Sequence, residues 1–218
     1  MSAKNYIQLV NDVLVRLRES EVSSVGDTPY SRLIARFVND AKRNVEDSYN
    51  WNALSDTLTA VTTPEIFNYV LVGSGQRFRI YDVINDTRDW VLEYRTTEFM
   101  NRLFLTESVQ RGAPMYYNFN GTNSNGDTQV DLYPIPDAAY SIRFNIALPQ
   151  PPLSADADIL KVPDEPVIFL AYAKALAERG EDGGMNSNEA YGLYQKSLAD
   201  AIALESGRYP EEQVWVEV

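Results

Sequence analysis

The carboxylates are the side chains of this sequence that could most readily take part in catalysis. Glu93, Glu98 and Asp131 lie in or near runs that are rich in aromatic residues. Two carboxyl groups that flank a sugar can hydrolyse a glycosidic bond when one is a protonated acid and the other stays ionised. Because the chain carries 31 acidic residues, such neighbours also arise by chance. A glycosidase that degrades cell walls is therefore one hypothesis for its function.

The composition excludes most other catalytic chemistry. The sequence has no His and no Cys, which removes Ser-His-Asp and Cys-His nucleophilic sites, disulfides and the usual zinc sites. A Ca²⁺ or Mg²⁺ site built from oxygen ligands needs neither residue, but the sequence lacks the calcium-loop motif. Gly-rich phosphate-binding motifs are also absent. We predict no catalytic, cofactor-binding or metal-binding residues.

The net charge is distributed unevenly along the chain. Residues 1–55 carry seven basic and seven acidic residues, residues 56–163 carry eight and thirteen, and residues 164–218 carry four and eleven. All of the net charge of −12 therefore arises after residue 55. DNA-binding proteins normally present an excess of Lys and Arg, which is missing here. With no export signal and no apolar run near ~18 residues, we expect a soluble chain that is not exported and has no membrane contact.

Residues 1–55 are predicted to form a helical hairpin. Apolar residues recur at helical spacing from Tyr6 to Leu17, and again from Leu33 to Val45. Thr28 is a good N-cap, and Pro29 suits the first position of the second helix. Trp51 ends this region, and we expect its ring to pack the two helices onto the part of the chain that follows.

Residues 56–163 are predicted to form a β-rich inserted domain. Its clearest hairpin joins Phe78–Ile84 to Trp90–Tyr94, and a short helix covers Glu98–Leu105. Pro134 and Pro136 cannot donate to a ladder, so one strand must end at Tyr133. The expected strands are Leu58–Thr62, Tyr69–Val72, Phe78–Ile84, Trp90–Tyr94, Met115–Phe119, Val130–Tyr133 and Tyr140–Leu148.

A polar, Gly-rich loop is predicted at residues 118–127, projecting outward as a tip with little intrinsic structure. The tip residues that we expect to contact a partner are Asn118, Phe119, Asn120, Asn123 and Asn125.

Residues 164–206 return to helix and are predicted to complete the bundle. One helix follows Pro163 and stops at Gly180, and a second covers about Asn188 to Glu205. Acidic residues cluster around the turn between them, namely Glu178, Glu181, Asp182 and Glu189. These carboxylates either solvate an exposed turn or line a surface that repels phosphate.

Residues 207–218 are predicted to form an extended arm. Its residues 214–218 are β-prone and apolar, so we expect them to bind a partner. The candidate contact residues are Tyr209, Val214, Trp215, Val216 and Val218. Together these elements predict an α+β protein, with two N-terminal and two C-terminal helices around an inserted antiparallel β domain.

The order of parts resembles the head–tail adaptor, or connector, proteins of tailed bacteriophages. The resemblance is carried by the helices that end in Tyr49-Asn50-Trp51, by a Gly-x-Pro-x-x-Tyr at 112–117, and by Leu-Tyr-Pro-x-Pro-Asp at 132–137. It continues in a Pro-Pro-Leu linker at 151–153 and a Pro-Asp-Glu-Pro helix start at 163–166. It spans roughly residues 5 to 206.

The resemblance implies a structural, non-enzymatic subunit of the virion neck, made in the host cytoplasm. Its implied partners are the portal protein, a tail or nozzle protein, and neighbouring copies in a ring, a dodecamer if it follows the portal. DNA would pass through this ring without specific binding, during genome ejection. The arm would contact the portal, and the tip would face the tail.

Two other functions stay open at the level of sequence. The aromatic content and the polar tip also fit a β-rich module that binds carbohydrate or protein. The paired carboxylates fit the cell-wall glycosidase. Neither alternative requires a ring.

Overall fold

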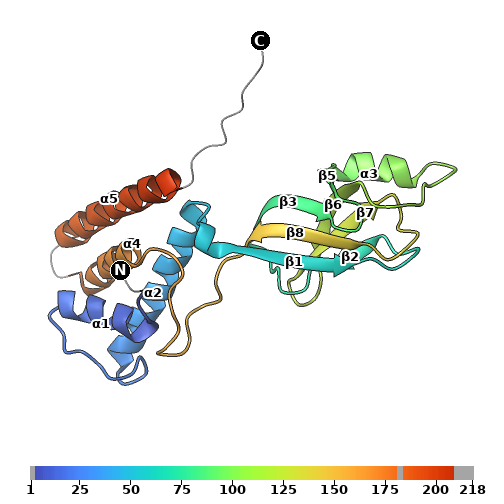
Figure 1. Ribbon diagram of the computed structural model, residues 1–218. Helices are drawn as coiled ribbons and strands as arrows, with labels where there is room; N and C mark the ends of the chain where they lie inside the picture. The colour runs from blue at the N-terminus through green and yellow to red at the C-terminus, as the bar shows by residue number, and fades with distance from the viewer. Residues whose placement is uncertain (1–2, 181–183, 209–218) are drawn as a thin grey trace, which may run out of the picture. The chain divides into compact units, whose positions relative to one another are not determined.

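The computed structural model describes residues 3–180 and 184–208, and the chain divides into two compact units (Figure 1). One unit is helical and is built from the chain up to Leu54 and from Gln150 onward. The other is β-rich and runs from Ser55 to Pro149. The predicted α+β class, with helices before and after a β region, is confirmed.

Helix α4 organises the helical unit. Its sequence is almost entirely apolar from Val167 to Ala177, and it contacts the other three helices (Figure 1). In the described part of the chain, no helix is long and apolar enough to cross a membrane. The four helices of the unit are α1 (Tyr6–Arg16), α2 (Pro29–Ser48), α4 (Asp164–Arg179) and α5 (Met185–Arg208).

Local capping explains where the first two helices begin. The Asn5 side chain accepts a bond from the backbone N–H of Gln8, and the Gln8 side chain accepts one from the N–H of Asn5. Thr28 and Ser31 exchange the same pair of bonds ahead of α2, with Pro29 at its first position. The predicted start of α2 is confirmed.

The buried pair Lys42–Glu46 fixes the segment that follows the β unit. Lys42 Nζ donates to Glu46 Oε1 (2.9 Å) and to the carbonyl of Gln150 (2.6 Å). Glu46 Oε1 also accepts the backbone N–H of Gln150 at 3.1 Å. These bonds hold the segment from Gln150 against α2, whereas the sequence had grouped residues up to 163 with the β domain.

The β unit consists of two four-stranded sheets. One has the strand order β1-β8-β3-β4, and the other has the order β2-β7-β6-β5. All pairs are antiparallel except β5 with β6. The strands are β1 (Ser55–Val61), β2 (Asn68–Val70), β3 (Arg79–Asn85), β4 (Trp90–Val91), β5 (Glu93–Tyr94), β6 (Tyr116–Thr122), β7 (Thr128–Tyr133) and β8 (Ser141–Ala147), and the unit also holds α3 (Thr97–Phe104).

Both sheets contribute to one apolar core. Strand β8 buries Ile142, Phe144 and Ile146, and strand β7 buries Val130 and Leu132. The apolar faces therefore pack between the sheets, as in two-layer β architectures. The chain leaves β7 at Tyr133 and enters β8 at Ser141, so the predicted corner at the two prolines is confirmed.

The predicted strand Trp90–Tyr94 is wrong as a single element. Trp90 and Val91 pair with β3 in one sheet, whereas Glu93 and Tyr94 pair with β6 in the other. Between them, buried Leu92 donates its N–H to the carbonyl of Val83 at 2.7 Å. The chain crosses between sheets here because Leu92 enters their shared core.

Candidate interaction surfaces

The residues predicted as a polar tip fall into two structural groups. Strand β6 extends to Thr122, so Asn118, Phe119 and Asn120 lie in a strand and not in a loop. The side chain of Asn118 is 1% exposed and donates Nδ2 to Thr97 Oγ1 at 2.9 Å. Phe119 packs edge-to-face on Phe78. Pairing with β7 and burial outweigh the turn preference of Asn and Gly.

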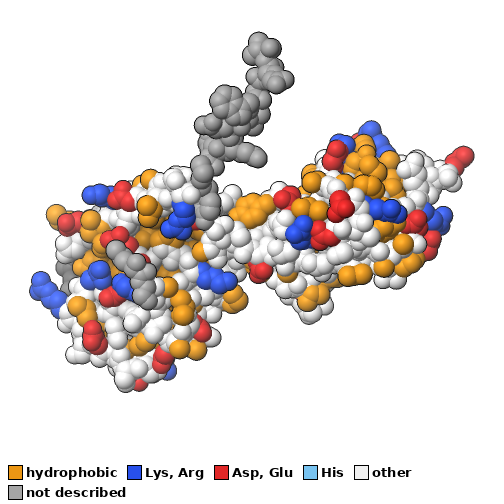
Figure 2. All heavy atoms as spheres, in the orientation of Figure 1, with side chains coloured by type: hydrophobic (Ala, Val, Ile, Leu, Met, Phe, Trp, Pro, Cys, Tyr) orange, Lys and Arg blue, Asp and Glu red, His pale blue; other side chains and the backbone are white. Residues whose placement is uncertain are grey.

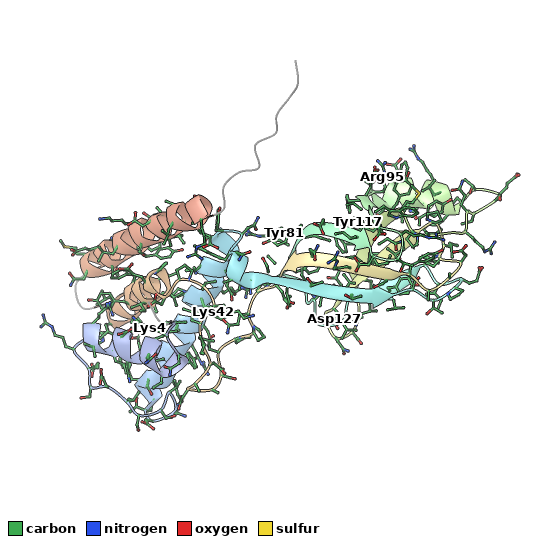
Figure 3. All side chains as sticks on the ribbon, in the orientation of Figure 1. Lys4, Lys42, Tyr81, Arg95, Tyr117 and Asp127 are labelled. Atoms are coloured by element: carbon green, nitrogen blue, oxygen red, sulfur yellow. The ribbon has the colours of Figure 1, made fainter. Side chains whose placement is uncertain are left out.

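The remaining tip, residues 123–127, is ordered by its own hydrogen bonds. The Asn123 side chain accepts the backbone N–H groups of Asn125 and Asp127, both at 2.9 Å. Asp127 Oδ1 accepts the N–H of Gly73 at 3.0 Å, which ties the turn to a neighbouring loop (Figure 3). The expectation of little intrinsic structure is therefore wrong, because the Asn123 amide acts as a turn acceptor. Asn125 is exposed at the apex.

Two of the four carboxylates predicted to form an acidic surface are described. Glu178 is exposed near the C-terminal end of α4, and Glu189 is exposed near the N-terminal end of α5. Glu181 and Asp182 lie outside the described residues. The nearby Arg179 points instead toward Glu19 and Tyr30, with which it bonds. Partial burial opposes the charge of Arg179, but these bonds outweigh burial and hold its pKa above the ordinary value.

The first two residues of the predicted arm are helical and not extended. Helix α5 continues to Arg208, so residues 207 and 208 are helical. Glu205 accepts the backbone N–H of Asn52 at 3.0 Å and pairs with Arg208 at 3.3 Å, which holds this last turn in place. The arm residues Tyr209, Val214, Trp215, Val216 and Val218 lie outside the described residues.

The carboxylates of the glycosidase hypothesis each have a separate partner. Glu93 pairs with Arg95, and Glu98 pairs with Arg102 one helical turn away. Asp131 is buried and accepts Asn68 Nδ2 at 2.6 Å. Among the described residues, no group of three or more acidic side chains is placed to hold a metal ion.

Comparison with protein families gives one match. The model of the SU10 adaptor protein family matches residues 4–213. The chain belongs to this family. The match supports a structural adaptor protein of a bacteriophage, present in the virion at the head–tail junction. A comparison with curated proteins gives no match.

The adaptor also carries an aromatic–arginine cluster that the sequence did not reveal. The Arg95 guanidinium lies 5.0 Å from the ring centroids of both Phe99 and Tyr116 (Figure 3). Tyr94 and Met115 are exposed nearby in sequence, and Figure 2 shows hydrophobic side chains gathered over the part of the β unit that carries α3. This stacking depends on the parallel pairing of β5 with β6, and no local sequence pattern predicts that pairing.

Proposed function

We propose that this adaptor is a ring subunit that joins the portal to the tail and surrounds the channel through which DNA passes. The family match over residues 4–213 is the observation that carries the proposal. The role is structural and not catalytic. Its partners are the portal protein, a tail or nozzle protein, and further copies of the same chain, twelve if the ring follows the portal.

The architecture suits a subunit of such a ring. A ring forms when one surface of each copy binds a different surface of the next copy, and the rotation closes. Two compact units give each copy separate surfaces for a neighbour and for a partner above or below.

Charge supports a channel that does not retain DNA. The chain has a net charge of −12, and Glu178 and Glu189 are exposed without an ion pair to any described residue. We assign these two residues, with Glu181 and Asp182, to the channel lining. Carboxylates repel phosphates, whereas a basic lining would bind them with a strong salt dependence.

The two ends of the subunit are assigned to different partners. The turn at 123–127 faces the tail, and its exposed Asn125 contacts a tail protein. The arm residues 209–218 hold the subunit onto the portal or an adjacent copy. Both assignments extend the adaptor role and rest on it.

Electron microscopy of portal particles with and without the protein tests the proposal. Added annular density beneath the portal, with the symmetry of a closed ring, is the expected result. Size-exclusion chromatography of the same mixture provides the stoichiometry. Portal particles that acquire no such density at saturating protein would overturn the proposal, while a monomer in isolation would not, because the ring is expected to assemble on the portal.

A further inference from the structure

The outer edge of strand β1 points to a docking site for an extended segment of a second copy. We propose that residues 214–218 of a neighbouring subunit add a strand to this edge, so that each copy in the ring is joined to the next by backbone hydrogen bonds. The inference rests on the proposed ring and names the contact that links its subunits.

Strand β1 is the long free edge of its sheet. It pairs only with β8, in register from Ser55–Ala147 to Val61–Ser141, and is seven residues long. The edge strand at the other side of this sheet, β4, has two residues, and the edge strands of the second sheet have two and three. Short edges offer little to pair with, whereas a seven-residue edge is a template for another strand.

The ladder shows which backbone groups of β1 face outward. Thr62 donates its N–H to the carbonyl of Tyr140, beside the last pair of the β1–β8 ladder. Because pairing groups alternate along an antiparallel strand, Ala60 and Leu58 also bond toward β8, and Val61 and Thr59 point away from it. No hydrogen bond from the described residues reaches the backbone of Thr59 or Val61.

Beyond Asp56 and Thr57, whose N–H bonds the Asp56 side chain at 2.8 Å, the sequence of this edge favours pairing. From Thr57 to Val61 it reads Thr-Leu-Thr-Ala-Val, without Pro, Gly, Lys or any other charge. Val61 is 65% exposed, and Leu58 and Ala60 are half-buried at the border of the core. Proteins usually protect such edges with charge, Pro or a bulge; Asp56 supplies charge at the start of β1, and Leu58 to Val61 carry none of these devices, which fits a partner strand there.

The occupant is argued from the sequence of residues 214–218. Val-Trp-Val-Glu-Val combines β-branched and aromatic residues with period-two alternation, and it has neither Pro nor Gly. The open stretch is Leu58 to Val61, because the outward N–H of Thr57 already bonds Asp56 Oδ1 at 2.8 Å, and a strand of five residues is long enough to cover it. An added strand would extend the half-buried Leu58 and Ala60 row with apolar side chains, while its backbone would bond the open groups of Thr59 and Val61.

The chain beyond α5 is long enough to reach a neighbouring copy. Glu205, in the last turn of α5, bonds the backbone of Asn52, which lies three residues before β1 begins. Ten residues, 209–218, span up to about 33 Å when extended, which is enough for residues 214–218 to reach an adjacent subunit of a closed ring.

A proline at Thr59 tests the edge without breaking the sheet. Because the N–H of Thr59 points away from β8, Thr59→Pro keeps the β1–β8 ladder and removes one donor from the open edge. We expect this variant to fold normally by circular dichroism and to be retained on portal particles at least about fivefold more weakly. Thr59→Val keeps the N–H and serves as the matched control, with wild-type retention expected. Equal retention of the proline variant and the control would overturn the proposal.

Disulfide mapping identifies the occupant, since the natural chain has no Cys. Copies with Thr59→Cys are mixed with copies that carry one Cys at a position from 214 to 218, and the mixtures are assembled on portal particles. Strand pairing predicts disulfide-linked dimers at alternate positions, either 214, 216 and 218 or 215 and 217. Thr59→Cys copies alone give the background.

The remaining outcomes are separable from failure of the adaptor role. Rings that form but give no dimers above background, or dimers at all five positions equally, reject the strand contact and leave the ring intact. A further mixture contains a few chains that carry both Cys residues and an excess of wild-type copies. If the doubly substituted chain forms a disulfide within itself, its own segment is the occupant, and the contact with a neighbour is rejected. A Thr59→Cys disulfide to a portal or tail cysteine also rejects it. Absence of any ring rejects the proposed function itself.

Discussion

The buried pair Lys42–Glu46 provides the sharpest test of how α2 is held to the later segment of the helical unit that begins at Gln150. The two side chains are 4% and 1% exposed, and between them they bond both the N–H and the carbonyl of Gln150. Lys42→Met keeps the length and apolar stem of the side chain and removes its charge. It removes the bond from Nζ to Glu46 Oε1, while the Glu46 carboxylate stays buried.

The expected cost follows from burial. Removing one partner of a buried ion pair destabilises a protein by roughly 3–5 kcal/mol. The double variant Lys42→Met/Glu46→Gln has no buried charge, and the side-chain amide introduced at position 46 can still accept the N–H of Gln150. It should cost only about 1–3 kcal/mol, the typical penalty for one unsatisfied carbonyl, here that of Gln150. The double variant should therefore be more stable than Lys42→Met alone.

Urea unfolding followed by circular dichroism measures these differences. Lys174→Met is the matched control, because Lys174 pairs with Asp40 at 3.6 Å on the surface of the same unit and should contribute less than about 1 kcal/mol. The reasoning is refuted if Lys42→Met costs no more than the control, or if the double variant is no more stable than Lys42→Met alone.

Three further predictions concern other parts of the molecule. Deleting residues 209–218 should leave the urea midpoint nearly unchanged and strongly reduce incorporation into particles; a truncated chain that joins particles as well as the full one contradicts the arm. Replacing residues 123–125 by Gly-Ser-Gly, with Gly126 (φ 85°) and Asp127 kept, should preserve folding and block tail attachment, counted by electron microscopy; normal attachment contradicts the tip assignment. Tyr6→Phe should cost about 1 kcal/mol by loss of the 2.9 Å bond to the carbonyl of Ala35. Burial raises the pKa of Tyr6 to about 12, so wild-type stability should fall as pH rises from about 10 to 12, and the slope should be shallower in the variant, where the other tyrosines with a raised pKa still contribute.

Elements fixed by neighbouring residues could be predicted from the sequence. The start of α2 follows from Thr28 and Pro29, and the end of β7 follows from two prolines that cannot donate to a ladder. Thr96 caps α3 by accepting the N–H of Phe99, as expected for a short helix beginning there. Each of these signals acts within about four residues.

Features that depend on distant pairing could not be predicted in this way. Residues 118–122 have the composition of a loop, yet they form a strand because β7 supplies hydrogen bonds and Asn118 finds Thr97 in the interior. The segment from Trp90 to Tyr94 looks like one strand, and its division becomes apparent only when both sheets are present. The Lys42–Glu46 pair joins α2 to a segment more than a hundred residues later.

The same local pairing clarifies the electrostatics of the proposed channel. Arg95, Arg102, Arg111, Arg143 and Arg179 each form an ion pair with a carboxylate of the same chain. An arginine that is already paired attracts phosphate less, because part of its charge is balanced at short range. In the proposed channel, the unbalanced charge of −12 would therefore repel DNA within about a Debye length, roughly 10 Å, of the surface. Raising the salt concentration screens this repulsion and should not release DNA, which is the reverse of the response of a basic DNA-binding ring.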